Sequence, residues 1–152
     1  MPKSRTIHMS HNVSVLIYHF VCPAKYRRSV FDPHVDEELC KICEEIQKRY
    51  DIYFLEIGTD KNHVHFLIQS IPRLSPSDII RIIKSITARE IFKKCPEVKK
   101  QLWGGEFWSD GYYVSSVAQY ATESVIQNYV KKQGLELEYK KLVIQQLTLF
   151  DM

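Results

Sequence analysis

Two apolar stretches separated by a short turn constrain the fold of this chain more than any other feature. Residues 53–57 and 63–69 are rich in β-branched and aromatic side chains, and residues 58–62 between them contain Gly58, Asp60 and Asn62. Short runs of this kind, bounded by turn-forming residues, are typical of paired strands. The pattern therefore predicts a β-hairpin.

The periodicity on both sides of this hairpin predicts the other elements. Residues 13–22 are β-branched and aromatic and end at Pro23, which predicts a strand, and residues 107–117 predict another. Apolar residues at helical spacing predict helices at 34–49 and from Ser77, as N-cap, to just before Pro96. A further helix is expected at 118–132, closed by Gly134. The order β-α-β-β-α-β predicts an α+β, ferredoxin-like or RRM-like split βαβ fold: an antiparallel sheet with helices on one face, followed by a C-terminal helix.

Length and composition fit one globular domain. The chain has 152 residues, of which 45% are hydrophobic and 26% charged, so a mainly disordered or collagen-like chain is excluded. We expect a single domain over residues 1–152, with a core at about 13–134 and a tail at 135–152. No apolar run reaches the length of a membrane span, and residues 1–12 lack the apolar segment of a signal peptide. We therefore expect a cytoplasmic protein with reduced cysteines and no membrane partner.

A pair of histidines on the second strand of the hairpin is the first candidate site. His63 and His65 lie two residues apart, so on a strand both imidazoles point to one face while Val64 points to the other. Two neutral imidazoles side by side form half of a divalent metal site. The alternative is a pair of polar residues on a solvated sheet face.

Tyr129 and Gln133 form the second candidate pair. Their i,i+4 spacing places them on one face of the last predicted helix, where a tyrosine hydroxyl would lie beside a metal ligand. The alternative is a tyrosine that packs half-buried on an amphipathic helix.

Basic residues and two cysteines complete the candidates. The net charge of +3 permits nucleic-acid binding without requiring it. Cys40 and Cys43 are spaced as in a zinc or redox motif, but their place on the apolar side of a helix favours core packing. Basic side chains follow the first strand and line the second predicted helix, with aromatic residues between them. These aromatic rings would stack on unpaired bases of a nucleic acid. The alternative is that the basic residues form only a solvated cationic face. They are Lys25, Arg27, Arg28, Lys84 and Arg89, with Trp108 among the aromatics.

Taken together, these stretches resemble one family, the single-tyrosine HUH transposases of the insertion-sequence 200/605 group. Four motifs carry the resemblance, in the order in which the family has them. They are Tyr18-His-Phe-Val with Lys25-Tyr-Arg-Arg; Thr59-Asp-Lys-Asn-His-Val-His; Leu102-Trp with Phe107-Trp-Ser-Asp-Gly-Tyr-Tyr-Val-Ser-Ser-Val; and Val125-Ile-Gln-Asn-Tyr-Val-Lys-Lys-Gln.

The resemblance implies a role for each candidate residue. His63, His65 and Gln133 would be the ligands of Mg²⁺ or Mn²⁺, Tyr129 the nucleophile, and Lys84 and Arg89 DNA contacts. The family cleaves one DNA strand near a subterminal hairpin, forms a 5′-phosphotyrosine with a free 3′-hydroxyl, and rejoins strands. The resemblance also implies a homodimer whose active sites combine the histidines of one chain with the tyrosine helix of the other.

The sequence departs from the family pattern at two positions and leaves one alternative open. Asn62 stands where the family usually has an acid, which would weaken a contact to the first histidine, and Ala118 stands where a glycine is usual. The alternative function is a non-catalytic or domesticated hairpin-binding protein of the same fold. Because a pure binding module has no use for the paired histidines or for Tyr129 and Gln133, the sequence favours the enzyme.

Overall fold

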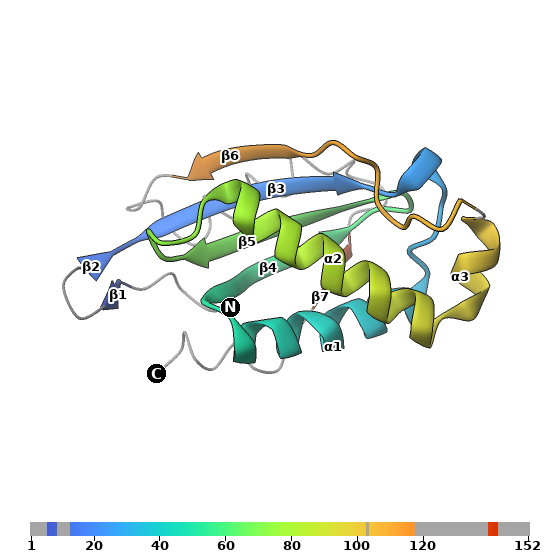
Figure 1. Cartoon of the computed structure of the whole chain (residues 1–152), viewed down its shortest axis with the longest axis horizontal. Helices are drawn as coiled ribbons and strands as arrows, with labels where there is room; N and C mark the ends of the chain where they lie inside the picture. Colours follow the sequence, from blue (N-terminus) through green and yellow to red (C-terminus); the bar gives the residue numbers. More distant parts are fainter. Residues whose placement is uncertain (1–5, 9–12, 103, 118–139, 143–152) are drawn as a thin grey trace.

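The structure, a computed structural model, describes residues 6–8, 13–102, 104–117 and 140–142 (Figure 1). Its helical elements are η1 (Lys25–Arg27), α1 (Pro33–Arg49), α2 (Pro76–Lys94) and α3 (Pro96–Gln101). Its strands are β1 (Ile7–His8), β2 (Val13–Ser14), β3 (Leu16–Pro23), β4 (Ile52–Thr59), β5 (His63–Ser70), β6 (Tyr113–Val117) and β7 (Lys140–Leu142). In this part of the chain, no helix is both long enough and apolar enough to cross a membrane.

An antiparallel five-stranded sheet in the order β6-β3-β5-β4-β7 forms the centre of the molecule. Figure 1 shows α1 and α2 side by side on one face of this sheet. The four strands β6, β3, β5 and β4 follow the ferredoxin-like plan, with the first and third strands of the motif at the centre. The predicted fold class is confirmed.

The core lies between this face of the sheet and the two helices. Alternate residues of β5, among them Phe66 and Ile68, are fully buried against Leu39 of α1 and Ile83 of α2. Burying one such side chain contributes about 1.5–3 kcal/mol. The opposite parity of β5 places its other side chains on the face away from these helices.

Two caps define where the helices begin. The Asp32 carboxylate accepts a hydrogen bond from the backbone N–H of Val35 at 2.9 Å and caps α1. Ser75, not the expected Ser77, caps α2, and it forms a capping box with Asp78. Pro76 then occupies the first helical position, which suits proline because its missing N–H would have no partner there.

Several predicted boundaries are wrong. Gly58 lies in β4 rather than in the turn, and it pairs with His65. The strand expected at 107–117 is limited to Tyr113–Val117, because Phe107 and Trp108 turn into the core and Trp108 forms only an isolated bridge with Ala24. The structure also adds α3 after Pro96, divides the first strand into β2 and β3, and places β7 beside β4. The helix expected at 118–132 lies outside the described residues.

Candidate active site

The paired histidines open β5 and lie on the face of the sheet away from α1 and α2. Val64 between them is fully buried in the core on the helix side, so the predicted alternation is confirmed. His63 is 8% exposed and His65 is 0% exposed, which excludes the alternative of a solvated sheet face. Buried polar side chains need partners, and each of these two imidazoles has one on its Nδ1 atom.

His65 contacts a third histidine, His19 of β3. The Nε2 atom of His19 lies 3.1 Å from Nδ1 of His65, and the two rings stack with their centroids 5.3 Å apart and their planes 7° from parallel. A metal bound at Nε2 of His65 requires the ring proton on Nδ1, and His19 is placed to accept that proton in a hydrogen bond. Ligating histidines usually donate their other ring N–H in this way.

Asn62 holds His63 in the same manner, and Asp60 faces the other ring nitrogen. The Asn62 Oδ1 atom lies 2.8 Å from Nδ1 of His63 and accepts a hydrogen bond from it. We expected this contact to be weakened because Asn62 replaces an acid, but the amide oxygen supplies it. The Nε2 atom of His63 then faces Oδ2 of Asp60 at 3.1 Å. With the proton on Nδ1, these two atoms are both acceptors and repel each other unless a proton or a cation lies between them.

These residues fit a divalent metal ion. Asp60, His63 and His65 are buried, and one ligand atom from each lies within 4.8 Å of the other two. The carboxylate adds a charged oxygen to the imidazole pair, and charged oxygens are the ligands that Mg²⁺ and Mn²⁺ prefer. The sequence predicted only neutral ligands here, so Asp60 makes the site better suited to these ions.

Burial keeps the imidazoles neutral, which is the form that binds metal. Burial lowers the pKa of His65 to about 3, and nearby positive charge on His19 and His63 lowers it as well. Burial also lowers the pKa of His19 to about 4. The pKa of His63 is lowered mainly by burial, and the Asp60 carboxylate partly opposes this shift.

Arg27 brings a positive charge to this site. Its charge makes a small contribution to the lowered pKa of His63. Tyr26 and Arg27 both have left-handed backbones, with φ of 57° and 51°. For residues other than glycine this conformation costs about 1–2 kcal/mol each, and such strain concentrates at functional sites. Arg28, the next residue, is exposed.

The other predicted DNA contacts are less available. Lys25 forms an ion pair with Glu106 at 2.7 Å, and Lys84 donates to the carbonyls of residues 109–111. Arg89 is exposed on α2, which lies on the opposite side of the sheet from the histidines. Trp108 is 6% exposed and its indole N–H donates to Thr87 at 2.9 Å, so base stacking does not fit its place in the core.

Two predicted site residues cannot be compared with the structure, and two others were missed. Tyr129 and Gln133 lie outside the described residues. His19 and Asp60 belong to the site but were not singled out from the sequence. A signal was present for both: a polar residue within an apolar central strand, and a carboxylate three residues before His63.

Comparison with known proteins identifies the family. Residues 12–133 match the family model described as "Transposase IS200 like". The chain is an IS200-like transposase. It is 30% identical over 118 residues to the ISDra2 transposase TnpA of Deinococcus radiodurans, covering 78% of this chain and 84% of that protein. It is 28% identical over 116 residues to the transposase for insertion sequence element IS200 of Salmonella typhimurium, covering 76% and 75%.

Solved structures agree with this assignment. A transposase from Deinococcus radiodurans superposes with a TM-score of 0.68 at 28% identity, covering 84% of this transposase and 97% of that chain. A REP-associated tyrosine transposase bound to a REP hairpin superposes with a TM-score of 0.54 at 11% identity, covering 82% and 68%. The second likeness supports the fold alone.

Proposed function

We propose that this transposase cleaves and rejoins single-stranded DNA at the ends of its insertion sequence through a 5′-phosphotyrosine on Tyr129. The ligand arrangement at the start of β5 carries the proposal. His63 and His65 both have Nδ1 hydrogen-bonded and lie in one buried group with Asp60. A protein that only binds hairpins has no need of such a group.

His63, His65 and Gln133 would hold Mg²⁺ or Mn²⁺, with Asp60 adding a carboxylate. A cation bound there would polarise the scissile phosphate and neutralise its developing charge. His19 and Asn62 fix the ring orientation of the two histidines. Arg27 holds a DNA phosphate beside them through its fixed positive charge.

Tyr129 attacks the phosphorus atom. The bond from its phenolic oxygen to phosphorus forms, the bond from phosphorus to the 3′ oxygen breaks, and no external energy source is needed. The phenolic proton passes to solvent and the 3′ oxygen takes one up, which leaves a free 3′-hydroxyl. Because a tyrosine with a pKa near 10 is mostly protonated at pH 7, attack depends on the activated phosphate. The 3′-hydroxyl of one strand then attacks a second phosphotyrosine and rejoins the DNA.

Recognition of subterminal hairpins completes the proposal. Arg27 and Arg28 are exposed and follow β3, whose last residue pairs with His63, and Arg89 offers a second contact from α2. The REP-associated tyrosine transposase of similar fold is bound to a REP hairpin, which supports this part of the proposal. We further propose a homodimer in which Tyr129 of one chain serves the histidines of the other.

The test replaces each histidine and follows cleavage of single-stranded element ends in Mg²⁺ or Mn²⁺. His63→Ala and His65→Ala should lose cleavage and retain DNA binding, and chelator should stop cleavage by the parent protein. Lys48→Ala is the control, because this side chain is half-exposed on α1, on the side of the sheet away from the histidines. Undiminished cleavage in chelator would contradict the metal role, and hairpin binding without any cleavage would favour the non-catalytic alternative.

A further inference from the structure

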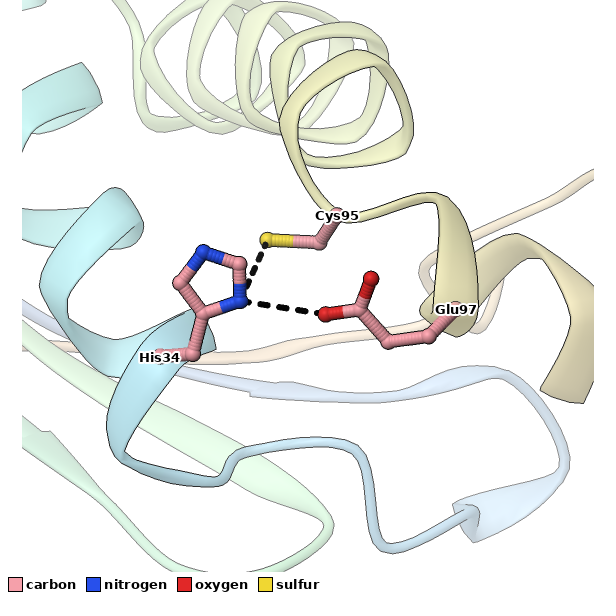
Figure 2. A group of neighbouring side chains, drawn as sticks. All are labelled: His34, Cys95 and Glu97. Atoms are coloured by element: carbon pink, nitrogen blue, oxygen red, sulfur yellow. Dashed lines mark hydrogen bonds and ion pairs between the residues drawn. The ribbon is translucent and has the colours of Figure 1, made fainter.

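A second group of metal-ligating side chains lies among the helix ends, apart from the active site (Figure 2). His34 is in the first turn of α1, Cys95 joins α2 to α3, and Glu97 is in the first turn of α3. Residues 61 positions apart therefore meet at one point. The active-site histidines come from strands and share no member with this group.

The donor atoms are spaced as the ligands of one ion would be. The Nδ1 atom of His34 lies 3.1 Å from Oε1 of Glu97 and 3.8 Å from Sγ of Cys95, and Figure 2 shows both side chains turned toward this nitrogen. All three donors lie within 4.8 Å of one another. With zinc bonds of about 2.0 Å to nitrogen and oxygen and about 2.3 Å to sulfur, tetrahedral ligands are about 3.3–3.5 Å apart. The two distances to Nδ1 are within a few tenths of an ångström of these values.

The His34 imidazole joins α1 to the junction of α2 and α3 through its contacts to Glu97 and Cys95, and none of the three side chains caps α1 or α3. Asp32, not His34, caps α1. Cys95 precedes α3 at the N-cap position, but its side chain makes no capping hydrogen bond. The thiol is fully buried, whereas the His34 and Glu97 side chains are 52% and 49% exposed, so an ion can enter from solvent.

The charges around the thiol favour a cation. Burial raises the pKa of Cys95 to about 11, and the carboxylates of Glu97, Glu38 and Asp32 raise it further, while Lys94 opposes them. Without a cation the sulfur therefore stays protonated at neutral pH. A thiophilic ion displaces that proton to solvent and binds the thiolate.

We propose that His34, Cys95 and Glu97 bind a zinc ion that fastens the first turn of α1 to the junction of α2 and α3. A cysteine, a histidine and a carboxylate are zinc ligands, whereas Mg²⁺ prefers oxygen alone. Three protein ligands leave one tetrahedral position to water. The ion is structural, because these residues lie in the helical layer and the active-site histidines face the other side of the sheet. The proposal does not depend on the DNA chemistry.

Cobalt absorption of the full-length protein tests this site directly. Zinc is spectroscopically silent, so Co²⁺ serves as the probe, and only a cysteine ligand gives a sulfur-to-cobalt charge-transfer band. The active-site group has no cysteine and cannot produce this band. Two equivalents of Co²⁺, enough to fill both groups, should generate the band, and Zn²⁺ should abolish it by displacement.

Four variants separate this site from other thiols. Cys95→Ser should lose the band, and His34→Ala and Glu97→Gln should weaken Co²⁺ binding at least about tenfold. Cys40→Ser, a partly exposed cysteine on α1, should keep the band unchanged. His34 and Glu97 are half-exposed, so their variants should fold even if Cys95→Ser does not. Zinc should also raise the Tm of the parent more than that of His34→Ala, which keeps the active-site group alone.

Two results would overturn the proposal. One is a parent protein that gives no charge-transfer band with excess Co²⁺. The other is a band whose intensity and midpoint are the same in folded His34→Ala as in the parent, which would assign the sulfur to an adventitious complex.

Discussion

Lys84 holds the segment that leads into β6, and its replacement gives the most quantitative test of the fold around the site. Its Nζ atom donates to the backbone carbonyls of Ser109, Asp110 and Gly111 at 2.8, 3.3 and 3.2 Å. It also lies 5.3 Å from the centre of the Tyr112 ring. These contacts join α2 to the residues that precede β6, an edge strand that pairs only with β3 in the described sheet.

Lys84→Met keeps the aliphatic stem and removes the charge. A hydrogen bond to a charged group contributes about 1.5–3 kcal/mol, and a cation over an aromatic ring about 0.5–1 kcal/mol. Two of the three carbonyl contacts are exposed, so water replaces much of their contribution. We therefore expect a loss of about 2–3 kcal/mol in the free energy of unfolding. At about 2–4 °C per kcal/mol for a chain of this size, the Tm falls by about 4–12 °C.

Urea and thermal unfolding of the parent, Lys84→Met and Arg89→Met measure this effect. Arg89 is the control, because its side chain is 64% exposed and its ion-pair contact, to Glu90, is 3.5 Å long. Arg89→Met should stay within about 0.5 kcal/mol of the parent. Two results together refute this reasoning. Lys84→Met would be as stable as the parent, and its plot of log K for single-stranded DNA against log salt concentration would be shallower by about 0.7, the loss of one phosphate contact. Lys84 would then contact DNA instead of the carbonyls.

Three further predictions concern the active site. In chelator, the free energy of unfolding should be highest above pH 6.5 and should fall as the pH is lowered. Burial lowers the pKa of His19 to about 4 and that of His65 to about 3, so between these values and pH 6.5 the unfolded chain binds more protons than the folded one. Urea titration should give a slope of up to about 1.4 kcal/mol per pH unit for each histidine, and a flat profile contradicts their neutral burial. Asp60→Asn should raise the Mg²⁺ concentration for half-maximal cleavage about tenfold or more, and an unchanged value removes Asp60 from the ion. Co-expressed His63→Ala and Tyr129→Phe chains should regain cleavage, because a mixed dimer has one intact composite site. Verified heterodimers without cleavage would contradict active sites shared between two chains.

The fold class and the histidine pair could be predicted because their signals are local. Strand alternation alone placed Val64 in the core and His63 and His65 on the other face. The start of α2 was missed by two residues because Ser75 and Ser77 are both acceptable caps in sequence, and only the capping box with Asp78 decides between them. Trp108 looked like an exposed aromatic, but its indole N–H is bonded to Thr87 in the core.

The missed parts of the site depend on distant residues that the sequence does not place together. His19 reaches His65 only because β3 pairs with β5 in a register that sets Val21 opposite His65, which makes the two histidines diagonal neighbours on one face. His34 and Cys95 likewise meet only after α1 and α2 pack side by side. Asp60 was within reach of the sequence, since a carboxylate three residues before His63 lies across the same hairpin turn.

The central claim is that Tyr129 attacks DNA, and the most direct measurement is the covalent adduct itself. Parent protein and Tyr129→Phe are incubated with single-stranded element ends and Mg²⁺ or Mn²⁺, denatured, and separated by size. The account predicts a denaturation-resistant adduct with the parent, whose tryptic phosphopeptide contains Tyr129, and none with Tyr129→Phe, which still binds the hairpin. An adduct of equal yield in Tyr129→Phe, carried by Tyr112, Tyr113 or Tyr120, would contradict it.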